Sequence, residues 1–168
     1  ASESTFYRVL RAADQQHRRG RSQPPRTVKA PTSHVATAAN QVWSWDITYL
    51  PSAVRGQYFY LYLIEDIYSR KGVGWEVYAQ ESGELAAKLL QRSVIGEQCL
   101  RQPLVLHSDN GAPMKSLTLL SKMHDLGITP SRGRPRVSND NAYSESLFRT
   151  LKYCPQWPQD GFADLDAA

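Results

Sequence analysis

The sequence contains few of the residues and segments that define several large classes of protein. It has only two cysteines, Cys99 and Cys154, whose spacing fits neither a disulfide framework nor a zinc site, so we expect a reducing, cytoplasmic location. No run approaches the roughly 20 apolar residues of a membrane span, and neither a secretory signal nor an internal repeat is found. At 168 residues and 41% hydrophobic content, the chain is long enough for one globular domain with a substantial core.

The net charge of +4 is unevenly distributed along the chain. Residues 1–40 contain seven Lys and Arg against two acidic residues, whereas residues 41–168 contain 13 against 14. Within the basic part, residues 4–13 have helical spacing and residues 17–40 are rich in proline and arginine, which is typical of a linker. A basic leader on a nearly neutral body suggests an arm that faces nucleic acid, although a solvated tail would carry the same charge. We therefore divide the chain into residues 1–40 and residues 41–168.

Hydrophobic periodicity in the second part predicts a mixed α/β fold. Residues 43–50 alternate between apolar and polar side chains, as on a strand. Two further strands follow after short links that favour antiparallel hairpins, and helices then alternate with short strands, with Ser82 as a candidate N-cap. The expected fold class is α/β, a five-stranded mixed sheet with helices on both faces. The predicted strands are residues 43–50, 57–66, 71–79, 103–108 and 128–131, and the predicted helices are residues 82–99, 114–127 and 141–152.

Three acidic residues stand in hydrophobic segments that are far apart in the sequence. Asp46 interrupts an apolar strand, where a carboxylate must be paired, hydrogen-bonded or bound to metal, and a salt bridge or edge position would explain it equally well. Asp109 follows a buried strand, where ligand sites of α/β sheets tend to lie, but Asp-Asn-Gly is also ordinary turn chemistry. Glu145 shares a polar helix stripe with Asn141 and Arg149, which is commonly an exposed face. Taken singly, the turn and the exposed face are the favoured interpretations of Asp109 and Glu145.

Taken together, the three acids favour a metal site. Two strand-associated aspartates and a helical glutamate can converge at one end of such a sheet. Oxygen ligands suit Mg²⁺ or Mn²⁺, and the histidines are too scattered to form a site for a softer metal. A pair of such ions about 3.5–4 Å apart assists in-line phosphoryl chemistry, and nearby basic residues would hold a phosphodiester backbone.

The segments around these acids resemble a known family. "WSWDITYLP" around Asp46, "HSDNG" around Asp109 and "NDNAYSESLFRTLK" around Glu145 resemble the integrase catalytic core of DDE transposases. The likeness is closest to the IS3-family insertion-sequence transposases, which are relatives of retroviral integrases, and it runs from about residue 42 to the end. The 35 residues between Asp109 and Glu145 are the usual separation in that family. The resemblance implies a ribonuclease-H-like fold and metal-dependent cleavage and strand transfer of DNA during transposition.

The resemblance also implies roles for individual residues. Asp46, Asp109 and Glu145 would be the catalytic ligands of Mg²⁺ or Mn²⁺, and Lys152 falls where the family carries a basic DNA contact. The partners would be transposon ends and target DNA, with a homo-oligomer as the active complex. Further DNA contacts are expected from Arg149, Asn110, Asn141, Arg132, Arg134 and Arg136.

The two ends of the sequence resemble remnants of neighbouring segments. Residues 4–11 resemble the last helix of a helix-turn-helix region, and residues 161–168 resemble the start of a helical tail. We therefore expect a catalytic core that lacks most of its site-specific DNA-binding part and some C-terminal helix. The loop of residues 132–140 is expected to be mobile without DNA, with Glu145 displaced from the aspartates.

Two other functions fit parts of the same sequence. A ribonuclease-H-type nuclease would usually need a fourth acid, for which Glu65 or Asp66 is available. A hairpin corner in which Asp66 pairs with Arg70 explains that segment equally well. A catalytically silent DNA-binding or assembly module is the second alternative. Cleavage of an RNA–DNA hybrid without strand transfer would favour the first, and DNA binding without metal binding would favour the second.

Overall fold

The computed structural model describes residues 2–13, 34–109, 111–133 and 141–168. The chain divides into two units, Ala1–Ala30 and Pro31–Ala168, which are described separately. In the first unit, α1 (Glu3–Ala12) forms the predicted N-terminal helix, and none of its side chains is buried. The domain boundary near residue 40 and the truncated C-terminus stay predictions.

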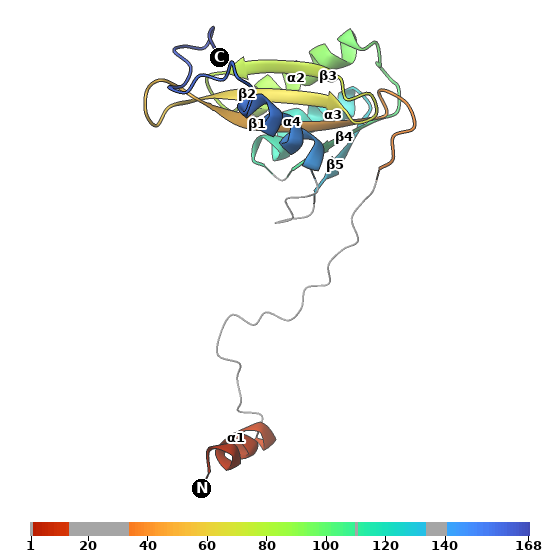
Figure 1. The fold of residues 1–168 in the computed structure, drawn as a ribbon. Coiled ribbons are helices and arrows are strands. Elements are labelled where there is room, and N and C mark those ends of the chain that lie inside the picture. The colour runs from red at the N-terminus through yellow and green to blue at the C-terminus, as the bar shows by residue number, and fades with distance from the viewer. Residues whose placement is uncertain (1, 14–33, 110, 134–140) are drawn as a thin grey trace. The chain divides into compact units, whose positions relative to one another are not determined.

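A five-stranded mixed sheet with the strand order β3-β2-β1-β4-β5 forms the centre of the second unit (Figure 1). β1 pairs antiparallel with β2 and β2 with β3, whereas β4 runs parallel to both β1 and β5. This arrangement confirms the predicted order of three antiparallel strands followed by alternating helices and strands. The short last strand tolerates Pro130 because it lies at the edge of the sheet, where a missing N–H breaks no ladder. The strands are β1 (Val42–Pro51), β2 (Tyr58–Asp66), β3 (Gly72–Tyr78), β4 (Leu104–Ser108) and β5 (Ile128–Arg132).

The helices of this unit begin at polar caps. Ser82 caps α2 (Gly83–Gly96) as predicted, since its hydroxyl accepts a hydrogen bond from the N–H of Glu84 at 3.2 Å. The predicted start of the next helix at residue 114 is wrong. Pro113–Lys115 forms a separate 3₁₀ turn, η1, and α3 (Leu117–Asp125) begins only after Ser116, whose extended backbone and hydroxyl cap it. The last helix is α4 (Ala142–Lys152), and none of the helices that the structure describes is long and apolar enough to cross a membrane.

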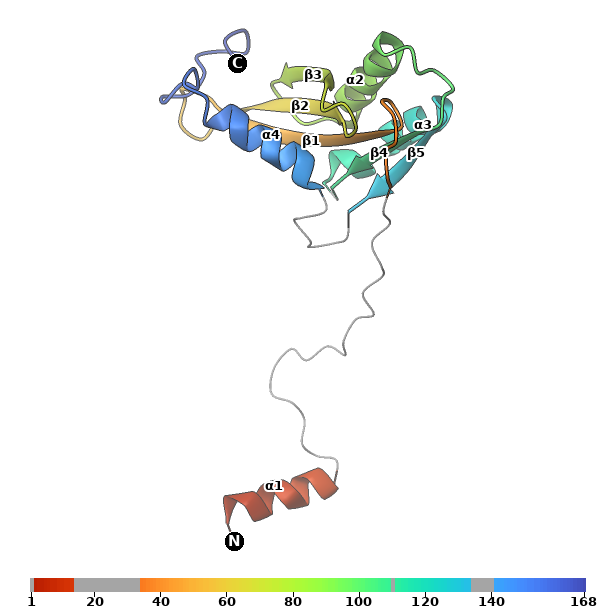
Figure 2. The ribbon, with the colours of Figure 1, turned by 45° about the vertical axis from the view of Figure 1, so that its right-hand side comes forward.

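Helices cover both faces of the sheet, as predicted. Trp43 and Trp45 of β1 are buried against α2 and α3, whereas Leu61 and Leu63 of β2 pack on the other face against Phe148 of α4. Figure 2 shows α4 lying across one side of the sheet, with α2 and α3 on the other. Burying one large apolar side chain contributes about 1.5–3 kcal/mol to the stability of the fold. The apolar residues of β1 and β2 therefore determine that one face of the sheet packs on α2 and α3 and the other on α4.

Candidate active site

Asp46 lies near the middle of β1 on the face that α4 covers. Side chains alternate along a strand, so Ser44, Thr48 and Leu50 share this face with Asp46. Leu50 packs in the same cluster as Phe148, which confirms the direction of the face. Ser44 and Thr48 are buried and Asp46 is partly buried. One oxygen of Asp46 accepts a hydrogen bond from the N–H of Ile47 at 2.8 Å.

Asp109 lies beside Asp46 because β1 and β4 run parallel. The last registered pair of these strands is Trp45 with Ser108, so Asp46 is the next residue of β1 and Asp109 directly follows the end of β4. Neighbouring strands lie about 4.8 Å apart, and paired residues of a parallel ladder point to the same face. Asp109 also accepts a hydrogen bond from the N–H of Gly111 at 2.8 Å. Asp109 thus makes a local hydrogen bond that fits the Asp-Asn-Gly sequence, directly after the carboxyl end of β4.

Polar contacts on both sides of Asp46 hold α4 along β1. The hydroxyl of Ser44 donates to Oδ1 of Asn141 at 2.5 Å and lies 2.7 Å from the hydroxyl of Ser144. At the other end, Nζ of Lys152 donates to the hydroxyl of Thr48 at 2.7 Å. The spacings match, since four strand residues rise about 13 Å and eight helix residues about 12 Å. The helix is thereby placed with Glu145 in the region of Asp46.

The electrostatics of Asp46 report the proximity of the other acids. Burial raises the pKa of Asp46 from 3.8 to about 7, and the negative charges of Asp109 and Glu145 add to the rise. The N–H of Ile47 and the charge of Lys152 lower it. The structure therefore brings the three predicted acids and Lys152 into one electrostatic neighbourhood.

The donor set of this neighbourhood fits a hard divalent cation. It consists of carboxylate oxygens, which are the ligands that Mg²⁺ and Mn²⁺ prefer. A partly buried carboxylate beside two others is unfavourable without a positive partner, and a cation would offset that energy. Within residues 34–109, 111–133 and 141–168, no three His, Cys, Asp or Glu side chains are arranged to hold one ion. Asp109 and Glu145 act on Asp46 through their charges, and the role of the three acids as metal ligands stays a prediction.

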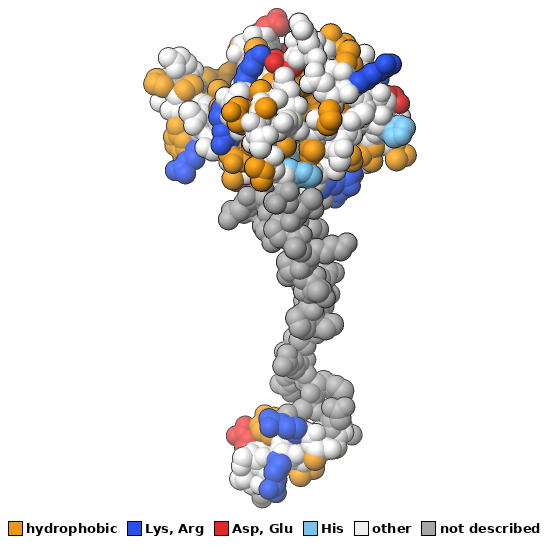
Figure 3. All heavy atoms as spheres, turned by 90° about the vertical axis from the view of Figure 1, so that its right-hand side faces the viewer, with side chains coloured by type: hydrophobic (Ala, Val, Ile, Leu, Met, Phe, Trp, Pro, Cys, Tyr) orange, Lys and Arg blue, Asp and Glu red, His pale blue; other side chains and the backbone are white. Residues whose placement is uncertain are grey.

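The predicted basic contacts surround this neighbourhood unevenly. Arg149 is exposed on α4, with its guanidinium 5.9 Å from the ring centre of Tyr153. Arg132 ends β5 and donates to the carbonyl of Met114 at 3.3 Å. On the face shown in Figure 3, Lys and Arg side chains lie apart from one another and form no single patch among the described residues. Three other predicted contacts lie outside the described residues, namely Asn110, Arg134 and Arg136.

The candidate fourth acids end β2, with Glu65 opposite Ser44 on the face of Asp46 and Asp66 opposite Trp43 on the other face. Asp66 is fully buried and accepts hydrogen bonds from the N–H of Asn40 at 3.0 Å and from the N–H and hydroxyl of Ser69 at 2.8 and 2.5 Å. The predicted hairpin corner is present, but the pairing of Asp66 with Arg70 is wrong, because Ser69 takes that place. Neither Glu65 nor Asp66 is among the charges that shift the pKa of Asp46.

The serine contacts that hold α4 were not anticipated from the sequence. Ser44 and Ser144 are fully buried and Asn141 is 6% exposed, with its amide also donating to the carbonyl of Trp45 at 3.4 Å. The available signal was the alternation of β1, which places small polar residues on the face of Asp46. The predicted contact of Asn141 with DNA or metal-bound water stays a prediction.

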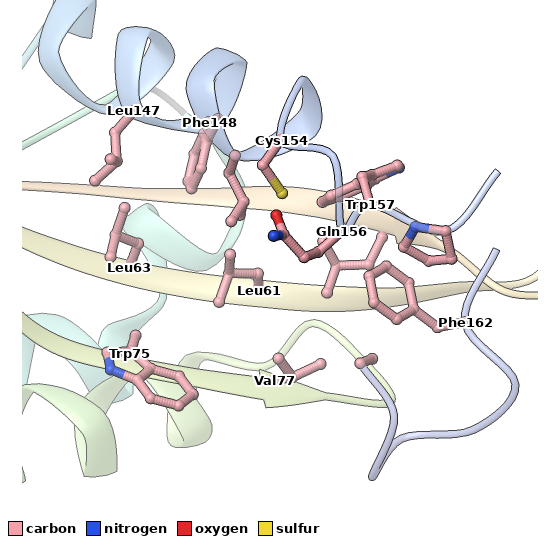
Figure 4. A pocket seen from close by; sticks show the side chains of 14 residues that line it. Leu61, Leu63, Trp75, Val77, Leu147, Phe148, Cys154, Gln156, Trp157 and Phe162 are labelled. Atoms are coloured by element: carbon pink, nitrogen blue, oxygen red, sulfur yellow. The ribbon is translucent and has the colours of Figure 1, made fainter.

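One groove of the described part of the chain is apolar and contains none of the site residues. It has a volume of about 380 Å³ and lies between the leucines of β2, the side of α4 and the segment that follows α4. Figure 4 shows the Cys154 sulfur and the Gln156 side chain directed toward it. Without acids or bases in its lining, this groove cannot support the chemistry of the carboxylates.

Comparison with known proteins identifies similar sequences. Residues 36–138 match the family model of the integrase core domain. The transposase for insertion sequence element IS904 of Lactococcus lactis subsp. lactis (strain IL1403) is 32% identical over 117 residues, which cover 70% of this chain and 45% of that protein. Transposase InsF for insertion sequence IS3A of Escherichia coli (strain K12) is 29% identical over 117 residues, which cover 70% of this chain and 40% of that protein. The chain thus spans less than half the length of these two relatives.

Solved structures show the same fold. A chain in the simian T-cell lymphotropic virus intasome, determined with PP2A regulatory subunit B56 gamma, matches with a TM-score of 0.56 at 19% identity, over 95% of this chain and 57% of that one. The HTLV-2 integrase catalytic core domain in complex with magnesium, in its dimeric form, matches with a TM-score of 0.50 at 19% identity, over 75% of this chain and 81% of that one. These likenesses confirm the predicted ribonuclease-H-like fold.

Proposed function

Because this chain belongs to the integrase core domain family, we propose that it is the catalytic core of a transposase that cleaves DNA and joins DNA strands. The observation that carries the proposal is that Asp109 follows the end of β4 where its parallel neighbour β1 continues into Asp46. The charges of Glu145 and Lys152 also act on the Asp46 carboxylate. Structural ion pairs also shift pKa values. At Asp46, however, the added charges of Asp109 and Glu145 have the same sign as its own carboxylate, which is typical of functional sites.

Asp46, Asp109 and Glu145 are proposed as ligands of Mg²⁺ or Mn²⁺. Such an ion supplies activation of an oxygen nucleophile, which is water in cleavage and a 3′-hydroxyl in strand transfer, and it stabilises the leaving oxygen. Lys152 already directs its ammonium group toward the hydroxyl of Thr48, two residues from Asp46. From that position it would donate to a non-bridging phosphate oxygen and orient the scissile phosphodiester beside the carboxylates.

Basic residues around the carboxylates are proposed to bind the DNA backbone. Arg149 lies one turn before Lys152 on α4, and Arg132 ends the edge strand. The remaining predicted DNA contacts are retained in this proposal and are Asn110, Asn141, Arg134 and Arg136.

The partners and location follow from the same proposal. We take the DNA to be the ends of a mobile element and its target, because the relatives are transposases of insertion sequences. Action as a homo-oligomer in the cytoplasm, where bacterial DNA lies, is part of the proposal.

The test is a strand cleavage and joining assay with the chain extended to the length of its relatives, Mg²⁺, and DNA that carries the ends of its own element. Asp109→Asn keeps the side-chain size and removes a charge that holds the cation, so cleavage and joining should both fall by at least about 10²-fold. Asp160→Asn is the matched control, since Asp160 is exposed and lies after α4. An Asp109→Asn protein that joins strands like its parent would overturn the metal mechanism.

The same assay separates the two alternatives. A ribonuclease-H-type nuclease would cut the RNA of an RNA–DNA hybrid while the parent joins no DNA strands. A silent module would bind DNA and show no cleavage for the Asp109 substitution to remove.

A further inference from the structure

The turn between β2 and β3 contains an arginine in an unfavourable backbone conformation. Arg70 has a φ of 64°, in the left-handed region that glycine adopts freely and larger residues rarely adopt. Its N–H donates to the carbonyl of Asp66 at 2.8 Å and closes the turn. A residue with a side chain in this region costs about 1–3 kcal/mol unless its surroundings compensate. Glycine would suit this backbone better, and contacts of the arginine side chain can compensate for the cost.

Those contacts lead to the first turn of α4. The guanidinium carbon of Arg70 lies 3.8 Å from the ring centre of Tyr143, within the range of a cation–π interaction. Tyr143 is the second residue of α4 and precedes Glu145 by two positions. The contact therefore joins the β2–β3 turn to the part of α4 that carries the third acid.

A buried acid beside the turn reinforces the contact. Glu65 is 5% exposed and pairs across the sheet with Ser44, on the face covered by α4. Burial raises its pKa and the positive charge of Arg70 acts in the opposite direction. One carboxylate oxygen of Glu65 has no hydrogen-bond partner among the described residues. Arg70 thus contacts the face of Tyr143, and its charge also acts on the buried carboxyl of Glu65.

We propose that Arg70 is a positioning residue that, through Tyr143, fixes the first turn of α4 and with it the approach of Glu145 to Asp46. The serine contacts of Ser44 hold the same turn from β1. Glu145 itself is exposed, and no hydrogen bond to another described residue fixes its side chain. Its position therefore depends on the Ser44 hydrogen bonds and the Arg70–Tyr143 contact, which hold the first turn of α4. This inference rests on the proposed function of the three acids.

Arg70→Gly is the most informative substitution, because a structural role and a positioning role predict different results. The change relieves the backbone and removes the guanidinium. The melting temperature should stay within about 2 °C of the parent or rise, whereas the dissociation constant for Mn²⁺, measured by calorimetry without DNA, should rise about fivefold to tenfold. Hydrogen exchange of the amides in the first turn of α4 should accelerate by a similar factor. In the DNA assay, kcat should fall while KM for DNA changes little.

Substitutions of the stacking partner provide the matched control. Tyr143→Phe keeps the ring and should leave Mn²⁺ affinity within about twofold of the parent, whereas Tyr143→Ala should match Arg70→Gly. The double variant Arg70→Gly with Tyr143→Ala should bind Mn²⁺ as tightly as either single variant, since both substitutions remove the same contact. Additive losses in the double variant would overturn the pairing of the two side chains.

The Asp109→Asn protein separates failure of this inference from failure of the proposed function. If Asp109→Asn binds Mn²⁺ as well as the parent, the metal site itself is wrong. If Asp109→Asn loses Mn²⁺ while Arg70→Gly keeps parental affinity and exchange rates, the site stands and the positioning role of Arg70 is wrong. A large fall in melting temperature for Arg70→Gly together with Tyr143→Ala behaving as the parent would also overturn it.

Discussion

Replacement of Asp46 by Asn should stabilise the folded chain at pH 8, and the gain should disappear near pH 4. Burial and the charges of Asp109 and Glu145 raise the pKa of Asp46 from 3.8 to about 7. The folded chain therefore holds the Asp46 proton more tightly than the unfolded chain does. The contribution of this group to the free energy of unfolding is present below about pH 4 and is lost as the pH rises to about 7.

The size of the effect follows from the shift. Each pKa unit corresponds to about 1.36 kcal/mol, so a rise of about three units amounts to about 4 kcal/mol in the free energy of unfolding. Asp46 is partly exposed, and water reduces this figure. We expect Asp46→Asn to unfold with a free energy about 2–4 kcal/mol higher than the parent at pH 8, and about equal to it at pH 4.

The measurement is urea unfolding of parent and variant across this pH range without divalent ions. Asp160→Asn serves as the control and should show no pH-dependent difference from the parent. Added Mn²⁺ should stabilise the parent more than Asp46→Asn, because only the parent keeps both aspartates of the pair. Equal stability of parent and Asp46→Asn at pH 8, or a difference that is the same at pH 4, would refute the electrostatic description of the site.

Three further substitutions address binding and packing. Lys152→Ala should weaken DNA binding and reduce the salt slope of log affinity by about 0.9, the value of one phosphate contact, as measured by fluorescence anisotropy at several salt concentrations; an unchanged slope would exclude the contact. Ser44→Ala should lower the free energy of unfolding, measured with urea, by about 1–3 kcal/mol, because the buried side chains of Asn141 and Ser144 lose a hydrogen-bond partner. Phe148→Ala should cost about 3–5 kcal/mol in the same measurement, since Phe148 is the buried side chain of α4 in the core, and a loss below about 1 kcal/mol would contradict the observed packing.

The sheet was largely predictable because its signals are local. Alternation along residues 43–50 reports directly which side chains share a face, and the short links before β2 and β3 favour hairpins. The short strand β5, which contains Pro130, was also predicted, over residues 128–131. The start of α3 was not, because Met114 and Lys115 continue the helical pattern while the extended backbone of Ser116 breaks it.

The sequence pointed to the three acids of the candidate site, but it did not reveal the contacts that hold α4 beside them. Each acid alone had an ordinary explanation, and only their order and spacing pointed to a shared site. The hydrogen bonds of Ser44 with α4 join residues about a hundred positions apart, so no local pattern reveals them. The same holds for Arg70, whose sequence neighbour Asp66 was a plausible partner, whereas the folded chain brings Tyr143 over its guanidinium instead.

The central claim is that Asp46 and Asp109 hold a divalent cation, and anomalous diffraction from crystals of this chain grown with Mn²⁺ tests it most directly. We expect one anomalous peak bonded to carboxylate oxygens of both residues, at about the 2.0–2.1 Å typical of Mg²⁺, with Glu145 nearest among the other acids. Crystals of Asp109→Asn should lack that peak. A peak that contacts neither aspartate, or fully formed crystals in which the two carboxylates share no ion at millimolar Mn²⁺, would contradict the claim.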